Sequence, residues 1–541
     1  MPGMGNSELP IPDGLELRPF RGVRFAVDDP AKVTSPPYDL ISDGDVHALL
    51  DSHPYNVVRL ILPISPSGDA NQPAPAGHFG ESTPAPGTSA NPRTPPAHSQ
   101  PHGHSPAKPA SAPGAPAAAP PSGRPAAAPQ PGRLAAAPPS GRPATAPQPG
   151  RATVTPEAGS SEASPARYGQ ARDTLQAWLA SGVLVVDDRP ALYVYEQRGE
   201  HVVQRGLIGD VCLADPAQGI VLPHEDVMPG PIADRLALMS TTQANLEPIF
   251  LLYDGATGTA TTLVDEVAAT RPPLVTAHTE DGLTHRLWAI TDEAEIDAVN
   301  ADLHARQALI ADGHHRYATY RVLQRQEHAT RPQPAGSQVP SSGASPLSRR
   351  AGGGPWDFGL ALLVDSRAYP PDLKAIHRVI PGLPLPEAAA RAKGAWRVQD
   401  QEDLAEGMAA LDAADNPAFL LAGAEGVHLL THPDPVQLAL AMPADRSDRW
   451  NSLNTSILTQ FVLPKVWGLQ DDEKTVRIVH HDPYAALRLA VETGGTAVLL
   501  KPLAVDDVLA VAAGGERVPR KSTSFGPKPR TGLVLRTFAI D

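Results

Sequence analysis

The sequence predicts an α/β (α+β) protein with mixed sheets, interrupted by two Pro/Ala/Ser-rich tracts. Short apolar runs typical of buried strands alternate with longer segments of helical periodicity, which is the pattern of layered α/β architectures. One such run, residues 307–312, passes directly into a helical segment through a glycine. The two tracts, residues 64–167 and 330–355, cannot bury enough apolar surface to fold, and they leave about 410 residues of globular sequence.

The individual elements follow from the spacing of apolar residues. Runs rich in Val, Ile and Leu predict strands at residues 56–62, 191–196, 206–213, 249–254, 285–290, 307–312, 357–365 and 495–503. Apolar residues three and four apart predict helices at residues 168–180, 232–243, 261–270, 292–305, 313–326, 452–460, 483–492 and 505–513. The helix at 168–180 follows the strand at 56–62 across the first tract, so we expect both sides of that tract to belong to one domain.

The chain is accordingly divided into five parts. These are the N-terminal part of a globular domain (1–63), a disordered insertion (64–167), a core (168–329), a second disordered insertion (330–355) and a C-terminal α/β region (356–541). In the first insertion, SGRPAAAPQPGR recurs as SGRPATAPQPGR, a composition that favours polyproline conformations. A tolerated insertion in a surface loop is the favoured interpretation, and a segment that binds a protein partner is the alternative.

Composition excludes several classes of function. Cys212 is the only cysteine, which excludes an intrachain disulfide and a zinc site with two or more thiolates. The N-terminus lacks the order of a signal peptide, and no apolar run reaches the roughly 18 residues of a membrane span, so we expect a cytoplasmic protein. The net charge is −14, and residues 64–167 carry seven basic and four acidic side chains, so the remainder carries −17. Such acidity disfavours nucleic acid as a partner.

The segment IADGHHRY is predicted to be a phosphate-binding turn at the start of a helix. A strand ends at Asp312, and Gly313 permits a sharp turn and the close approach of a ligand. The helix then presents unpaired N–H groups and the positive end of its dipole, a recurring phosphate site. His314 and His315 add hydrogen-bond donors, and Arg316 adds a guanidinium suited to phosphate oxygens. Asp312 is a candidate ligand for Mg²⁺ or a group that orients the substrate.

Two other interpretations of this turn stay open. Asp312 could only cap the helix while the imidazoles are packed or solvated, although three consecutive polar side chains at such a turn favour function. A metal site formed by His314 and His315 is less favoured, because adjacent side chains on a helix point in divergent directions.

A second candidate is Glu225, in the segment VLPHEDVMPGPIADRLALM between a predicted strand and a predicted helix. A carboxylate held in a Pro/Gly loop beside His224 is a candidate general base. The alternative is that these are solvated loop residues and that Asp234, placed with Arg235 in the first turn of the helix, complements the helix dipole.

A third candidate is the loop KSTSFGPKPRTG near the C-terminus. Lys521, Lys528 and Arg530 accompany hydroxyl groups and a glycine there, and such a loop could close over phosphates. A solvated basic loop is the equal alternative. The His-Arg pair at 377–378 and the His-His-Asp segment at 480–482 are interpreted as structural.

Eight segments resemble, in order, a widespread bacterial family catalogued as domain-of-unknown-function family 1015. They are PFRGVRF, TSPPYDLIS, HPYNVVRL, PHEDVMPGPIADRL, ANLEPIF, LIADGHHRYATY, IHRVIP and KSTSFGPK. The HE pair and the later DGHHR also look like the ParB/sulfiredoxin superfamily, especially its free-serine kinase branch. This second resemblance implies a ParB/sulfiredoxin-like core in which Glu225 is the base on a substrate hydroxyl and Asp312 assists the metal or substrate. The residues that it assigns to nucleotide phosphate are Gly313, His314, His315 and Arg316.

Together these observations predict a nucleotide-dependent phosphotransferase that acts on a small hydroxyl-bearing metabolite, with serine-like compounds as candidates. Its cofactors would be ATP or ADP, or another nucleotide, and Mg²⁺, and Lys521 and Lys528 would help to hold phosphate. No GxxxxGK[ST] segment occurs, which excludes a P-loop mechanism. The alternatives are a ParB-like nucleotide-binding regulator without significant turnover and a non-catalytic scaffold. A sulfiredoxin-like activity is rejected, since it needs a cysteine beside the turn.

Overall fold

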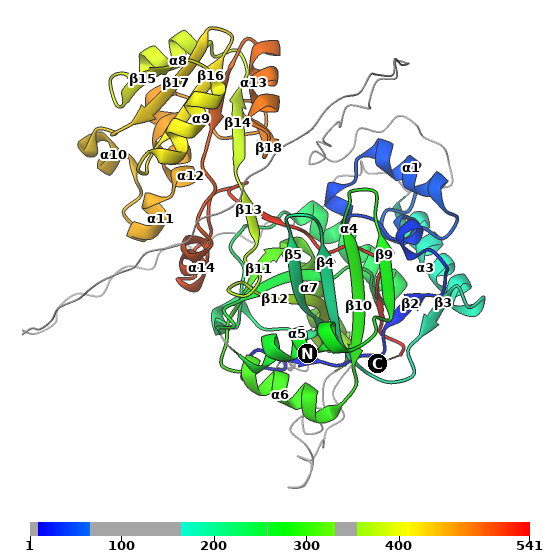
Figure 1. Cartoon of the computed structure of the whole chain (residues 1–541). Coiled ribbons are helices and arrows are strands. Elements are labelled where there is room, and N and C mark those ends of the chain that lie inside the picture. The colour runs from blue at the N-terminus through cyan, green and yellow to red at the C-terminus, as the bar shows by residue number, and fades with distance from the viewer. Residues whose placement is uncertain (1–8, 65–163, 257, 331–353, 541) are drawn as a thin grey trace, which may run out of the picture. The chain divides into compact units, whose positions relative to one another are not determined.

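The computed structural model describes residues 9–64, 164–256, 258–330 and 354–540. The two Pro/Ala/Ser-rich tracts, with the repeat in the first, lie outside the described residues except at their ends. The described chain forms two large sheets flanked by helices (Figure 1), which confirms the predicted α/β class with mixed sheets. None of the helices in these ranges has the length and apolar character needed to cross a bilayer.

The main sheet has nine strands, in the order β6-β11-β8-β12-β5-β4-β10-β9 with β1 paired to β5. They are β1 (Leu17–Arg18), β4 (Leu192–Arg198), β5 (Val203–Cys212), β6 (Val221–Leu222), β8 (Ile249–Tyr253), β9 (Val275–His278), β10 (Thr284–Ile290), β11 (Ala308–Asp312) and β12 (Phe358–Asp365). The pairs β12–β8 and β11–β6 are parallel, and the other pairs are antiparallel. Because β12 lies in the middle of this sheet, the main core extends beyond residue 356.

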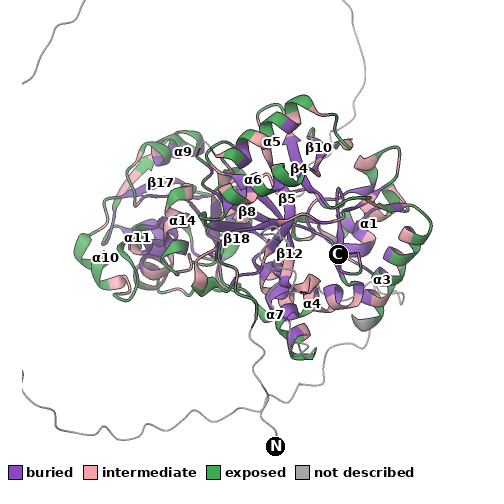
Figure 2. Ribbon diagram, turned by 90° about the horizontal axis from the view of Figure 1, so that it is seen from below, coloured by how far each residue is buried: buried purple, intermediate pink, exposed green. Residues whose placement is uncertain are grey.

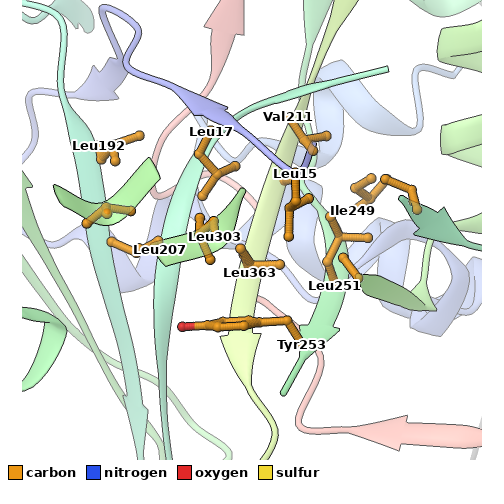
Figure 3. Packing of buried hydrophobic residues seen from close by; sticks show 14 of the residues in the cluster. Leu15, Leu17, Leu192, Leu207, Val211, Ile249, Leu251, Tyr253, Leu303 and Leu363 are labelled. Carbon is orange, nitrogen blue, oxygen red and sulfur yellow. The ribbon is translucent and has the colours of Figure 1, made fainter. Parts of the chain in front are cut away.

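Both faces of the main sheet are covered, and its strands β8, β11 and β12 are buried almost throughout (Figure 2). On one face, apolar side chains such as Leu251, Leu303 and Leu363 form a cluster with three helices (Figure 3). These helices are α5 (Thr259–Thr270), α6 (Glu293–Leu303) and α7 (His314–Thr330). The other face packs against α14 (Val505–Ala513) and the C-terminal segment. Burial on both sides explains why these strands are continuous apolar runs instead of alternating ones.

The residues before the first tract pack together with the helix that follows it, in one hydrophobic cluster. The elements concerned are β2 (Val23–Phe25), η1 (Pro30–Val33), η2 (Tyr38–Leu40), α1 (Asp43–Ser52), α2 (Val58–Ile61), α3 (Ser164–Ala180), β3 (Leu184–Val186) and α4 (Pro229–Thr242). The predicted strand at residues 56–62 is wrong, since this segment contains the helical turn α2. Val58, Leu60 and Ile61 are all buried there, and a short apolar run does not distinguish a strand from a buried helix.

The second sheet has six antiparallel strands, in the order β15-β17-β16-β19-β14-β18. They are β14 (Ile376–Ile380), β15 (Arg397–Gln401), β16 (Phe419–Gly423), β17 (Gly426–Thr431), β18 (Arg477–His480) and β19 (Thr496–Leu499). The accompanying helices are α8 (Leu385–Ala392), α9 (Leu404–Ala413), α10 (Pro435–Ala441), α11 (Asp448–Ser452), α12 (Asn454–Ile457) and α13 (Pro483–Glu492). The helix predicted at 452–460 does not end there, because α12 continues as a π-helix to Trp467.

After α14 the chain returns from the second sheet to the main core. β20 (Ser524–Gly526) pairs with β13 (Asp372–Lys374), and β21 (Arg536–Thr537) pairs with β7 (Ala244–Asn245). An isolated bridge joins Ser35 to Thr531. The segment KSTSFGPKPRTG therefore lies beside the N-terminal segment TSPPYD, although the two are at opposite ends of the sequence. The remaining predicted strands and helices are present with shifts at their ends; the strand predicted at 495–503, for example, ends at Leu499.

Candidate functional site

The IADGHHRY segment forms the predicted strand–turn–helix unit. β11 ends at Asp312, α7 begins at His314, and Gly313 between them has a φ of 91°. A Cβ atom at Gly313 would lie 2.9 Å from Cγ2 of Ile249, so the turn requires glycine for its space and its backbone conformation. The first intrahelical hydrogen bond is donated by Tyr317 N to Gly313 O, at 2.8 Å. The preceding amides are therefore the unpaired N–H groups expected at a helix start.

The side chain of Arg316 has a different orientation from the one predicted. The residue is only 4% exposed, with Nη1 donating to Pro248 O at 2.6 Å and Nη2 donating to Asp312 Oδ2 at 2.5 Å. Burial by itself would lower the pKa of Arg316, but the nearby carboxylates of Glu247, Asp312 and Asp39 raise it. The guanidinium thus stays charged and fixes the end of β11, and its two Nη atoms are already used within the protein.

The two imidazoles of the turn hold the loop that carries Glu225. Nε2 of His314 accepts from His224 N at 3.3 Å, and the rings of His314 and His224 meet edge to face at 4.5 Å. Nε2 of His315 accepts from Met228 N at 3.1 Å. Burial lowers the pKa of each of these histidines, for His224 to about 3. The rings are therefore neutral near pH 7, and Nε2 of His314 and Nε2 of His315 each accept from a loop amide.

Glu225 is half-buried in this loop, and the C-terminal segment holds it in place. Thr523 Oγ1 donates to Glu225 Oε1 at 3.0 Å and lies 2.8 Å from His224 Nε2, while Val518 N donates to His224 O at 2.9 Å. Burial raises the pKa of Glu225 above its ordinary value, and the charge of Lys521 opposes this effect. A carboxyl group with a raised pKa that already accepts a hydroxyl hydrogen bond has the properties of a general base.

Lys528 joins the turn to the N-terminal segment. Its Nζ lies 2.6 Å from Asp312 Oδ1 and 2.5 Å from Asp39 Oδ2. Burial would lower the pKa of Lys528, but the two carboxylates raise it. Burial would raise the pKa of Asp39, but Lys528 and Arg316 lower it to about 2. Asp39 and the ammonium of Lys528 are therefore ionised near pH 7, and Lys528 bridges Asp39 to Asp312.

Lys521 is the exposed cation of the site. It has a positive φ of 55°, and its ammonium has no hydrogen-bond or ion-pair partner among the residues that the structure describes. Its charge acts on Glu225, on His315 and on His480 of β18. Burial, followed by the charge of Lys521, lowers the pKa of His480 to about 4. The His-His-Asp segment, interpreted from sequence as structural, therefore lies close enough to the site to influence its charge.

Glu247, from the segment ANLEPIF, connects the ends of the chain behind the turn. Its Oε1 accepts from Tyr38 N at 3.0 Å and from Thr531 Oγ1 at 3.2 Å. The residue is 5% exposed, and its charge contributes to the raised pKa of Arg316. This carboxylate was not identified from the sequence.

All the residues predicted for the site are brought into one region of the structure. Those from the turn are Asp312, Gly313, His314, His315 and Arg316, and the others are Glu225, Lys521 and Lys528. Asp234 and Arg235, expected in the first turn of a helix, are instead beyond it, because α4 begins at Pro229. Asp234 accepts from Tyr168 and pairs with Arg167 and Arg235, which is a structural role at the α3–α4 contact.

A family described as "Protein of unknown function (DUF1015)" matches residues 17–77 and 151–456. The chain belongs to this family. No curated protein matches it. The DUF1015 match ends before residues 521–531, although the structure places that segment in the site.

Several solved structures are similar to this DUF1015 chain at low TM-scores. A free serine kinase variant in complex with ADP has a TM-score of 0.31 at 13% identity, covering 63% of this chain and 96% of that one. SbnI from Staphylococcus aureus, with a C-terminal truncation, has a TM-score of 0.30 at 10% identity, covering 61% and 88%. A conserved hypothetical protein from Pyrococcus furiosus has a TM-score of 0.29 at 13% identity, covering 64% and 100%. These values are too low for the likeness to bear on activity.

The predicted ligands fit the DUF1015 site unequally. For a phosphate group, the site offers the amide end of α7 and the exposed ammonium of Lys521. For Mg²⁺, the fit is poor, because Lys528 and Arg316 already pair with the two oxygens of Asp312. In the described part of the chain, no group of three or more His, Cys, Asp or Glu residues is arranged to hold a metal ion. The assignment of Asp312 as a metal ligand is therefore not supported by this arrangement.

Proposed function

We propose that this protein is a nucleotide-dependent phosphotransferase that acts on a small hydroxyl-bearing metabolite, with Glu225 as the general base. One observation carries the proposal. The carboxylate of Glu225, with a pKa raised by burial, accepts a hydroxyl hydrogen bond from Thr523 beside the exposed ammonium of Lys521. A carboxylate suited to accept a proton from a hydroxyl group thus lies near an ammonium suited to bind a phosphate group, which supports the proposal.

In the reaction, the acceptor hydroxyl transfers its proton to Glu225 while its oxygen forms a bond to the terminal phosphorus of ATP or ADP. The bond from that phosphorus to the bridging oxygen breaks, and the nucleotide product leaves with the electron pair. Lys521 and the amides of His314 and His315 bind the phosphate oxygens in this scheme. Arg316 and Lys528 hold Asp312 and the turn in position, and no step is assigned to a metal ion.

A nucleotide-binding regulator without turnover is the second candidate. The observation in its favour is that the acidic groups other than Glu225 are already paired, as in the bridge from Asp39 through Lys528 to Asp312. Such a closed arrangement suits a binding module that changes conformation with its ligand. Binding measurements and turnover measurements separate the two candidates.

The test incubates the full chain with ATP or ADP and a panel of hydroxyl metabolites that includes serine, with phosphorylated products followed by ³¹P NMR. We expect Glu225→Gln to bind nucleotide as tightly as the wild type by calorimetry but to lose about 10²–10⁴-fold in kcat. We expect Lys521→Met to weaken nucleotide binding at least about tenfold, since a hydrogen bond to a charged group contributes about 1.5–3 kcal/mol. Turnover that survives in Glu225→Gln would place the base elsewhere, and nucleotide binding without any product would favour the regulator.

A further inference from the structure

We propose that Arg378, a buried residue of the second sheet, is a positioning residue that fixes Lys521 and Glu225 through the main chain of residues 518–523. The inference rests on the proposed function, and it assigns part of that function to the C-terminal region. Arg378 lies on β14 and is 2% exposed, and its hydrogen bonds reach neither the amides of His314 and His315 nor Glu225. Its influence would have to pass through the segment that it binds.

The guanidinium of Arg378 binds main-chain carbonyls. Nη1 donates to Ile376 O at 3.0 Å, and Nη2 donates to Arg520 O at 3.1 Å and to Lys521 O at 2.9 Å. Two consecutive carbonyls of the loop are therefore bound by one nitrogen of a rigid planar group. Such a fork defines the direction of the peptide planes at residues 520 and 521.

Burying the charged guanidinium of Arg378 lowers the stability of the fold, which argues against a role in packing alone. Within the described ranges no carboxylate lies at ion-pairing distance from Arg378, and burial lowers its pKa to about 10. Asp471 opposes that shift, but the same carboxylate also lies 3.6 Å from Arg520. A buried cation without a close counter-ion is stabilised mainly by the carbonyl groups that it binds.

The peptide that Arg378 fixes contains a backbone conformation that needs support. Lys521 has a φ of 55°, which residues with a side chain adopt rarely. Arg378 binds the carbonyls of the peptides on both sides of Lys521, and three residues later β20 pairs with β13, with Phe525 opposite Leu373. Arg378 of the second sheet and the separate β13–β20 pair thus keep Lys521 in its left-handed conformation.

The same segment holds the base. Val518 N donates to His224 O, and Thr523 Oγ1 donates to Glu225 Oε1. The hydrogen bonds of Arg378 end on the carbonyls of residues 520 and 521, and the main chain leads from there to Thr523, which donates to Glu225. A change at Arg378 is therefore expected to move Lys521 relative to Glu225.

The test compares Arg378→Met and Arg378→Lys with Arg391→Met. Arg391 is a control for the loss of an arginine from the same region: it lies on α8, donates to Trp467 O at 2.8 Å and pairs with Glu387, and its side chain is 44% exposed. The first readout is the titration of the Glu225 carboxyl by ¹³C NMR in protein with labelled glutamate, assigned by comparison with Glu225→Gln. This readout needs no turnover, so it remains valid if the proposed phosphotransfer is wrong.

The charges that act on Glu225 are Lys521 and Lys528, which lower its pKa, and Asp312, which raises it. If Arg378 positions Lys521, Arg378→Met raises the pKa of Glu225, and adding Lys521→Met to it produces no further rise. Arg378→Lys, which keeps a charged donor, gives a smaller rise, and Arg391→Met gives none. In the activity assay, Arg378→Met lowers kcat on the order of 10- to 100-fold, since a misplacement of about 1 Å can cost about 10²-fold.

A lower melting temperature in Arg378→Met with an unchanged Glu225 titration would overturn the inference and leave Arg378 a purely structural residue. Additive shifts in the double variant would overturn it as well, because the two residues would then act independently. If Arg378→Met does not fold, the titration of Arg378→Lys decides the question by the same criterion.

Discussion

Replacing Lys528 with methionine tests the bridge that joins the two ends of the chain at the site. Methionine retains most of the length of the side chain but removes the ammonium between Asp312 and Asp39. Those carboxylates lie 2.6 and 2.5 Å from the lysine Nζ, so both lose a direct counter-ion. Arg316 still neutralises Asp312, whereas Asp39 keeps no other close ion pair among the described residues.

The expected loss of stability follows from the two carboxylates. The pKa of Asp39 falls from an ordinary 3.8 to about 2 in the fold, which at 1.36 kcal/mol per pKa unit corresponds to about 2.5 kcal/mol. The side chain of Asp39 is 35% exposed, so solvent screening reduces its share to about 1 kcal/mol. Asp312, 11% exposed, adds about 1–2 kcal/mol because a buried charge is left partly uncompensated. We therefore expect Lys528→Met to be less stable by about 2–3 kcal/mol.

The assay is urea unfolding of both proteins, followed by circular dichroism, at pH 7 and in steps down to pH 3. Because the pKa of Asp39 is lower in the folded state, its contribution is complete above pH 4–5 and is lost as the pH falls toward about 2. The difference in free energy of unfolding between the wild type and Lys528→Met should thus become smaller as the pH falls. Lys521→Met, at an exposed lysine of the same segment, should change stability by less than about 0.5 kcal/mol. Equal stability of Lys528→Met and wild type at pH 7 would refute the bridge.

Two further predictions concern the turn and the base. Gly313→Ala should lower the free energy of unfolding by about 1–3 kcal/mol, because of the positive φ and the close contact with Ile249. Gly169→Ala, in the interior of α3 where a Cβ meets nothing, should be neutral or stabilising. Equal changes in melting temperature for the two variants would contradict the predicted turn geometry. The activity of the wild type should fall at acid pH with an apparent pKa above 4.5, because burial raises the pKa of Glu225 and a general base must be ionised. An apparent pKa of 4.5 or lower for this fall in activity would argue against Glu225 as the base.

The local part of the site could be predicted from sequence because its signals are local. Gly313 between an apolar run and a helical pattern specifies its own turn, and the Pro/Gly-rich context of Glu225 marks a loop. The side-chain direction of Arg316 could not be predicted in this way. Its partner Pro248 is 68 positions away in the sequence, and the buried carboxylate Glu247 lies next to it. Tertiary contacts therefore turn the guanidinium of Arg316 inward, where it binds groups of the protein instead of a ligand.

The distant part of the site depends on pairing across the whole chain. Asp39 and Lys528 are 489 positions apart, and no spacing rule connects them. Asp39 and Thr523 belong to the motifs TSPPYD and KSTSFGPK, but nothing in the sequence singles either residue out as part of the site. In the second sheet, several strands between residues 376 and 431 were not predicted: β15 has few buried apolar side chains, whereas β14 and β16 are buried runs of only five residues. The ParB/sulfiredoxin-like assignment of the core stays a prediction.

Hydrogen–deuterium exchange of the full chain, with and without ATP, tests most directly whether four distant segments form one ligand site. The segments are residues 34–39, 224–228, 312–316 and 521–528. If they share the nucleotide site, peptides from all four should exchange more slowly together when ATP is bound, and at an ATP concentration near the wild-type Kd, Lys521→Met should reduce the effect in all four. Protection limited to one segment, or located outside them, would contradict the account.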